Sequence, residues 1–172
     1  MSTSDIVFTH IGYDRFLADI EVLACALEAD HWRPDYIVGI GRGGLVPGCF
    51  LSHRTGIPLL SVDHSSKVHD FAEALLTRLA AHTAKGERYL FVDDINDTGK
   101  TIAHMQAAIA TRGGVPVNVR FAVLVDNTVS AARVDYRARR IDRTFDKDWF
   151  VFPWEAVAPA AVIADEARED PA

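Results

Sequence analysis

The feature that most constrains the fold is a stretch near the middle of the chain, LFVDDINDTGKT, which spans residues 90–101. Its first three residues are apolar, as in a buried strand, and acidic, hydroxyl and glycine residues follow at once. Residues 99–111 then place Ile102, Met105 and Ile109 on one helical face. The stretch therefore predicts a strand, a short loop and a helix.

The loop in this stretch has the chemistry of an anion site next to a cation site. The start of a helix offers free N–H groups and the positive end of the helix dipole. Thr98 and Thr101 add hydroxyl groups, and Gly99 allows close backbone approach to a ligand. Asp93 and Asp94 at the strand end suit a hard cation, hydroxyl groups, or both. We expect a phosphate at one end of the loop.

Two other interpretations of this loop are weaker. Asp93 and Asp94 alone would pass for strand-end charges and Asp97 for a helix cap, but these residues share one turn with two threonines. Residues 99–101 read Gly-Lys-Thr, as at the end of a P-loop, yet that motif needs a glycine where Asp94 stands. The sequence thus argues against a P-loop ATPase.

A second glycine-rich turn, IGRGGLVPG at residues 40–48, follows another buried strand pattern at 35–40. Its glycines free backbone amides to face a phosphate, and the Arg42 guanidinium can bind two oxygens at once. We expect a loop here, then a helix with Pro47 in its first turn and Gly56 just past its end. A plain strand-to-helix turn remains the alternative for this segment taken alone.

Strand and helix patterns alternate through most of the chain, which predicts one α/β domain with a twisted, mainly parallel sheet flanked by helices. In such sheets ligands bind at the carboxyl ends of the strands. A polar segment at 63–70 lacks periodicity and predicts an exposed loop. The remaining expected elements are helices at 13–29 and around 71–79, and strands at 59–62, 88–92 and 115–125.

Composition narrows the class of partner. The chain has 172 residues, of which 49% are hydrophobic, an ordinary value for a globular protein. Its net charge of −6 argues against nucleic acid as the main partner. One basic run, at Arg133, Arg137, Arg139, Arg140 and Arg143, alternates with acidic residues and predicts a solvated face or a subunit contact. Apolar runs are too short for a membrane span, and residues 1–5 do not resemble a secretion signal. We expect a cytoplasmic protein.

Residues 90–101 closely resemble the signature of type I phosphoribosyltransferases, which bind phosphoribosyl pyrophosphate (PRPP), and residues 40–48 resemble the pyrophosphate loop of the same family. The resemblance covers about residues 13–155. It implies the type I phosphoribosyltransferase fold with a small C-terminal hood, in a domain at 1–158. The tail at 159–172 is expected to form a short helix or a frayed end. Family members often carry a cis or strained peptide at the position of Gly41–Arg42.

The resemblance also implies roles for individual residues. Asp93 and Asp94 would face the ribose hydroxyls and hold Mg²⁺, and residues 97–101 would wrap the 5′-phosphate. Asp97 is the candidate general base, and Arg42 would stabilise the departing pyrophosphate. The full implied PRPP-binding set is Arg42, Gly43, Gly44, Asp93, Asp94, Asp97, Thr98, Gly99, Lys100 and Thr101.

A third resemblance lies near the C-terminus, at DWFVFPWE, residues 148–155. An aromatic cluster is often simply core, but in 6-oxopurine enzymes an aromatic residue at the place of Trp149 stacks on the base. One departure concerns the lysine that bonds the 6-oxo group in those enzymes. Here the corresponding segment, residues 124–128, reads LVDNT and contains no lysine.

Together these features predict a magnesium-dependent purine phosphoribosyltransferase acting on PRPP and a 6-oxopurine such as hypoxanthine, guanine or xanthine. The missing lysine motivates a second hypothesis, a PRPP-binding regulator with little catalysis. An orotate enzyme shares the PRPP loop but not the tryptophan-containing tail, so it ranks lower. The resemblance further implies a homo-oligomer, a dimer or a tetramer, with no role for nucleic acid or membrane.

Overall fold

The computed structural model describes residues 6–62 and 69–169, and its centre is a five-stranded sheet. The strand order is β3-β2-β4-β5-β6, and every neighbouring pair is parallel. The predicted α/β class is therefore confirmed. The strands are β2 (Tyr36–Ile40), β3 (Leu59–Val62), β4 (Tyr89–Asn96), β5 (Val119–Asn127) and β6 (Tyr136–Ile141).

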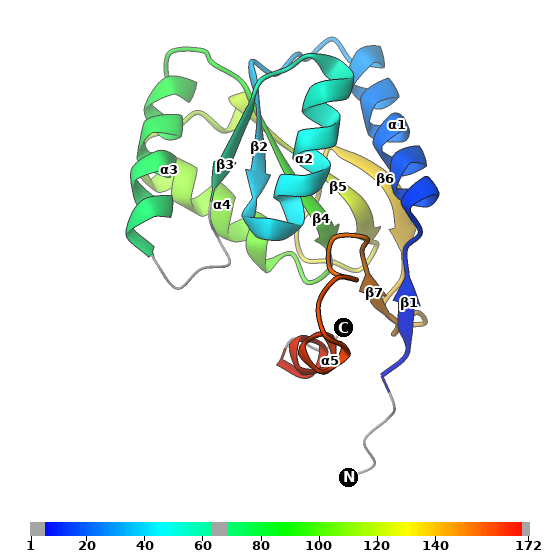
Figure 1. Cartoon of the computed structure of the whole chain (residues 1–172). Coiled ribbons are helices and arrows are strands. Elements are labelled where there is room, and N and C mark those ends of the chain that lie inside the picture. The colour runs from blue at the N-terminus through cyan, green and yellow to red at the C-terminus, as the bar shows by residue number, and fades with distance from the viewer. Residues whose placement is uncertain (1–5, 63–68, 170–172) are drawn as a thin grey trace.

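Helices cover both faces of this sheet (Figure 1). On one face lie α1 (Tyr13–Ala29) and α2 (Gly41–Thr55), on the other α3 (His69–Thr83) and α4 (Lys100–Thr111). Successive strand residues point to opposite faces of the sheet. Because helices cover both faces, the central strands carry apolar residues on both sides. In β4, Leu90 packs with the α1 and α2 side while Phe91 packs with α3 and α4.

The chain turns in opposite directions from two adjacent strands at the middle of the sheet. From β2 it passes through α2 to β3, and from the neighbouring β4 it passes through α4 to β5. The carboxyl ends of β2 and β4 therefore flank the point where the topology switches. This is where open α/β sheets bind ligands, and here two helix N-termini meet.

A small hood lies beyond the carboxyl ends of β2 and β4 (Figure 1). It consists of β1 (Phe8–His10) paired in parallel with β7 (Trp149–Val151), followed by α5 (Ala160–Glu169). Ile163 and Ala167 of α5 are buried, which holds this helix against the rest of the protein. The C-terminal hood is thus confirmed, and most of the expected tail is a short helix.

Several element boundaries differ from expectation for local reasons. β4 continues beyond residue 92 to Asn96, because Asp93 and Asn96 still pair with β5. β5 begins at Val119 rather than at 115, since Pro116–Asn118 forms a 3₁₀ turn, η1. The helix α3 begins at His69, inside the segment expected to be a loop, and residues 63–68 lie outside the described residues. No helix in the described part of the chain is long and apolar enough to cross a membrane.

Candidate active site

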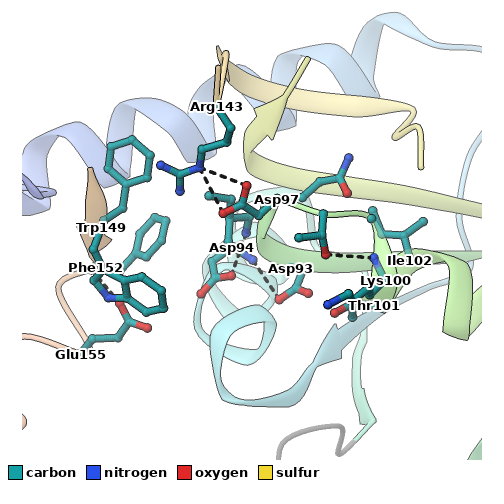
Figure 2. A pocket seen from close by; sticks show the side chains of 15 residues that line it. Asp93, Asp94, Asp97, Lys100, Thr101, Ile102, Arg143, Trp149, Phe152 and Glu155 are labelled. Carbon is teal, nitrogen blue, oxygen red and sulfur yellow. Dashed lines mark hydrogen bonds and ion pairs between the residues drawn. The ribbon is translucent and has the colours of Figure 1, made fainter. Parts of the chain in front are cut away.

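Two adjoining cavities open at the carboxyl ends of β2 and β4. The first, of about 250 Å³, lies between the β4–α4 loop and the hood (Figure 2). The second, of about 560 Å³, lies between the start of α2 and α5. Both are lined by Asp93, Asp94 and Glu155, so the cavities meet at these carboxylates. The first cavity contains every residue predicted for the 5′-phosphate loop, residues 97–101.

The β4–α4 loop can form only with glycine at position 99. Gly99 has a φ of 87°, in the left-handed region, and a Cβ there would lie 2.5 Å from the backbone nitrogen of Ala132. The helix α4 begins at the next residue, Lys100, and the glycine offers no side chain to cap its first turn. The Lys100 N–H donates to Thr98 Oγ1 at 3.4 Å, and the residues of this first helical turn, 100–102, line the first cavity. A helix start of this kind suits an anion.

The glycine-rich turn after β2 is helical rather than a loop, because α2 begins directly at Gly41. Bare backbone lets this helix start pack closely on β4. A Cβ on Gly44 would lie 2.0 Å from the carbonyl oxygen of Val92, and one on Gly43 would lie 2.4 Å from Asp94 Oδ2. The first turn of α2 thus lies directly against the carboxylate pair.

Arg42 extends from this turn toward α5. Its side chain is 81% exposed, and its Nη2 lies 3.3 Å from Glu166 Oε1. The peptide bond between Gly41 and Arg42 is trans, so the expected cis bond is absent here. Gly41 has a φ of 55°, which glycine adopts without strain. Arg42 lines the second cavity, together with Gly43.

Asp93 and Asp94 form a destabilised carboxylate pair. Each keeps part of its surface on the cavities, but burial raises the pKa of Asp93 well above its usual value, and the charge of Asp94 adds to this. Burial, followed by repulsion from Glu155, raises the pKa of Asp94 to about 7. Among the described residues, their oxygens accept neighbouring backbone N–H groups, from Asp94 to Asp93 Oδ1 (3.0 Å) and from Ile95 to Asp94 Oδ1 (2.7 Å), and the two carboxyl groups also contact each other. A cation at this place would remove the repulsion.

Glu155 is a third carboxylate at the junction of the cavities, and the sequence had assigned no role to it. Its Oε2 accepts a hydrogen bond from the backbone N–H of Phe152 at 2.9 Å. Burial raises the pKa of Glu155. The hydrogen bond fixes this carboxylate at the mouth shared by both cavities.

Asp97, the predicted general base, is paired with Arg143 (Figure 2). Arg143 Nε lies 3.0 Å and 3.1 Å from the two carboxylate oxygens. The Asn127 side chain donates to the backbone carbonyl of Asp97 at 2.9 Å and accepts from the backbone N–H of Arg143 at 3.1 Å. The carboxylate of Asp97 is therefore held in one orientation at the cavity wall.

Comparison with known proteins decides the family. A family model, the phosphoribosyl transferase domain, matches residues 13–159. The chain belongs to the phosphoribosyltransferase family. This membership confirms the resemblance drawn from residues 40–48 and 90–101.

Solved structures of other phosphoribosyltransferases share the fold. The purine phosphoribosyltransferase from Pyrococcus horikoshii matches with a TM-score of 0.63 at 26% identity, over 88% of this chain and 97% of that chain. The xanthine-guanine-hypoxanthine enzyme from Helicobacter pylori matches with a TM-score of 0.63 at 18% identity, over 95% and 99%. The orotate enzyme from Aeropyrum pernix matches with a TM-score of 0.52 at 22% identity, over 76% and 78%. These likenesses establish the fold and leave the base open.

Most arginines of the basic run, which was predicted to form a solvated face or a subunit contact, form ion pairs within this phosphoribosyltransferase. Arg137 pairs with Asp126 at 3.4 Å, and Arg139 pairs with the buried Asp19 at 2.9 Å. Arg143 is only 7% exposed and lines the first cavity. The prediction of a solvated face is therefore wrong for Arg139 and Arg143, whereas the Arg137 side chain is still 32% exposed. The sequence did not reveal Arg143 as a cavity residue, because only the folded chain brings the segment after β6 next to the β4–α4 loop.

The two tryptophans of the aromatic tail line different cavities. Trp149 lies in β7 and lines the first cavity with Phe150 and Phe152. Trp154 lines the second cavity, stacks on Phe152 with centroids 4.9 Å apart, and packs edge-on against Phe16 of α1. The two tryptophans of this tail therefore have different surroundings.

Asp126 and Asn127, at the positions where a base-binding lysine was considered, form hydrogen bonds within the protein. Asp126 is buried and accepts from Asn96 Nδ2 at 2.8 Å and from Arg137 Nη1 at 3.4 Å. Asn127 is buried against Asp97 and Arg143. Both side chains thus stabilise the loops around the cavity.

Proposed function

We propose that this phosphoribosyltransferase transfers the phosphoribosyl group from PRPP to a purine base, a 6-oxopurine, with the help of Mg²⁺. The products would be a nucleoside monophosphate and pyrophosphate. The observation that carries the proposal is the arrangement of two bare helix starts, at Gly41 and Lys100, on either side of the Asp93–Asp94 pair. Such an arrangement suits a ligand with two phosphate groups joined by a sugar.

The 5′-phosphate would bind at the start of α4, against the backbone of residues 97–101 and the hydroxyls of Thr98 and Thr101. The pyrophosphate would bind at the start of α2, against Arg42, Gly43 and Gly44. Arg42 is free to turn from Glu166 toward a ligand, because that ion pair is exposed and therefore weak. Its guanidinium would stabilise the charge that develops on the departing pyrophosphate.

Asp93 and Asp94 would hold Mg²⁺ together with ligand oxygens. No group of three His, Cys, Asp or Glu side chains in the described part of the chain is arranged for a metal. That fits Mg²⁺, which proteins commonly bind through one or two carboxylates plus substrate phosphates. The raised pKa values of the pair support a cation here, since a cation would relieve their repulsion. When bound, Mg²⁺ would neutralise charge on the pyrophosphate.

Asp97 and Trp149 would act on the base. Trp149 would stack on its ring, and Asp97 would accept a hydrogen bond from its N7–H as N9 attacks the sugar. The C1–O bond to pyrophosphate breaks with its electron pair, the N9–C1 bond forms, and the N7 proton follows to Asp97. The ion pair with Arg143 keeps this carboxylate fixed, which favours stabilising the charge on the base before the proton moves.

A regulator that binds PRPP without turnover is the second candidate. It is favoured by the hydrogen bonds of Asp126 and Asn127 within the protein, which leave neither of these two side chains to take the place of the lysine that binds the base. Against it, Asp97 and Trp149 both line the first cavity. Release of pyrophosphate distinguishes the two functions.

The test is release of pyrophosphate from PRPP and Mg²⁺, with hypoxanthine, guanine, xanthine, adenine and orotate offered separately. Turnover with at least one 6-oxopurine, and identification of its nucleoside monophosphate, is the expected result. Turnover with orotate alone would move the acceptor to the pyrimidines. Bound but intact PRPP with every base would favour the regulator.

A further inference from the structure

We propose that Arg143 selects the base by donating a hydrogen bond from Nη2 to the oxygen at position 6 of a 6-oxopurine. The inference rests on the proposed function and adds a specificity-determining residue to it. Arg143 follows β6 and is held at the wall of the first cavity, next to Asp97 (Figure 2).

The guanidinium of Arg143 has a fixed orientation. Nε contacts both oxygens of Asp97 at 3.0 Å and 3.1 Å, while Nη1 donates to the backbone carbonyl of Asp148 at 2.7 Å and to that of Asp146 at 3.3 Å. The group also lies over the Phe150 ring, 5.0 Å from its centroid. These contacts hold the arginine from two sides and leave it little rotamer freedom.

One nitrogen of this guanidinium is left over. Within the residues that the structure describes, Arg143 Nη2 donates to no protein acceptor, although the side chain is only 7% exposed. Nη2 is also absent from the described side-chain nitrogens that are sealed from solvent without a partner. Since Arg143 lines the first cavity, we infer that Nη2 is open to it. A buried arginine with a free donor facing a cavity suits an oxygen ligand.

The pair of Asp97 and Arg143 presents an acceptor beside a donor. A 6-oxopurine protonated at N7 offers the complementary edge, with the N7–H donor next to the O6 acceptor. Adenine places an amino group at position 6, so a donor would face the guanidinium instead of an acceptor. A site built to bond one of these groups discriminates strongly against the other, because the mismatch leaves buried polar groups unpaired.

The wall of the first cavity offers few cationic side chains that could bind the base in place of Arg143. Among the described residues that line it, the cationic side chains are Lys100 and Arg143. Lys100 begins α4 and is exposed beside the helix start proposed for the 5′-phosphate. Arg143 is thus the cation that adjoins both Asp97 and the aromatic wall.

The experiment compares Arg143→Gln with wild type and with Arg137→Gln as the matched control. Arg137 lies on β6 and pairs with Asp126, outside the described lining of both cavities. We expect Arg143→Gln to raise the KM for hypoxanthine about 10- to 100-fold, since a charged hydrogen bond is lost. The inhibition constant of adenine, measured as a competitor of hypoxanthine, should stay unchanged or fall, and the Kd for PRPP should not change.

Equal weakening of hypoxanthine and adenine would overturn the inference, because Arg143 would then only position Asp97. An unchanged KM for hypoxanthine would also overturn it, while leaving the proposed function intact. Failure of the wild type with every purine would overturn the proposed function and the inference together.

A second measurement on the wild type does not depend on the folding of a variant. Unsubstituted purine keeps N7 and N9 but has hydrogen in place of O6. We expect it to bind about 10- to 100-fold more weakly than hypoxanthine to the wild type, and this gap should close in Arg143→Gln. Equal binding of purine and hypoxanthine to the wild type would contradict a donor at position 6.

Discussion

Asp30 and the Asp93–Asp94 pair lie at opposite ends of the same parallel sheet, and their pKa values are shifted in opposite directions. Asp30 lies near the amino ends of β5 and β6, where Arg120 Nη1 donates to it at 2.6 Å and the Tyr136 hydroxyl at 3.0 Å. A hydrogen bond from the backbone N–H of Trp32, followed by those of Arg120 and Tyr136, lowers the pKa of Asp30 to about 2. Arg120 also lies over the Trp32 ring, 4.7 Å from its centroid.

The pair at the carboxyl end of β4 lacks comparable partners. Within the described residues, Asp93 and Asp94 accept adjacent backbone N–H groups and pair with no cationic side chain, and burial raises both pKa values. Satisfied carboxylates thus stabilise the amino end of the sheet, while desolvated ones face the cavities at its carboxyl end. Functional sites often carry such unfavourable arrangements until a ligand completes them. The difference indicates which end of the sheet binds ligand.

Asp97 and Asp30 both pair with an arginine, so a variant of Asp97 shows whether such a pair is only structural. We expect Asp97→Asn to lower turnover about 10²- to 10⁴-fold, the usual effect of losing a placed proton acceptor. The Kd for PRPP should change little, because the proposed 5′-phosphate site is formed by backbone N–H groups and hydroxyl groups rather than by the Asp97 carboxylate. Steady-state kinetics with calorimetric PRPP binding measures both. Unchanged turnover would place Asp97 with the structural carboxylates.

Asp94 sharpens the comparison because its loss should harm function and help stability. We expect Asp94→Asn to weaken PRPP binding in the presence of Mg²⁺ about 10- to 100-fold, since a charged ligand is removed. The same change should raise the Tm of the free protein at pH 8, because it removes a desolvated charge beside Asp93 and Glu155. Calorimetry and thermal melting are the measurements, and a lowered Tm would contradict the electrostatic description.

Asp30 is the matched variant at the other end of the sheet. Asp30→Asn should lower the Tm, because the amide cannot accept from Arg120 and Tyr136 as the carboxylate does. Turnover measured well below the melting range should equal that of the wild type. A loss of turnover without a loss of stability would show that the amino end of the sheet also serves function.

The two ends should also differ in how stability depends on pH. The pKa of Asp30 is lowered, so its contribution is present above pH 4 and disappears as the pH falls toward 2. The pKa of Asp94 is raised to about 7, so its penalty is absent near pH 4 and complete above pH 7. Denaturant melts of both variants across this range give the two slopes. Parallel pH profiles for the two variants would refute the distinction.

The sequence predicted the sheet, its helices and the β4–α4 loop that lines the first cavity, because apolar periodicity and the signatures at 40–48 and 90–101 are local. It could not place Arg143, whose role depends on the return of the chain after β6 to the mouth of β4. Glu155 escaped assignment for the same reason. The helical start of α2 at Gly41 was missed because glycines suggest a loop, whereas close packing on Val92 requires them.

Calorimetric titration of PRPP into the wild type at pH 8, with and without Mg²⁺, is the most direct test. At that pH we expect Asp94 to be ionised and available to the cation. We expect binding of one PRPP per chain that requires Mg²⁺ and is weakened in Asp94→Asn but not in Asp30→Asn. Absence of binding, or equal binding with and without Mg²⁺, would contradict the claim that the carboxyl end of the sheet is a magnesium–PRPP site.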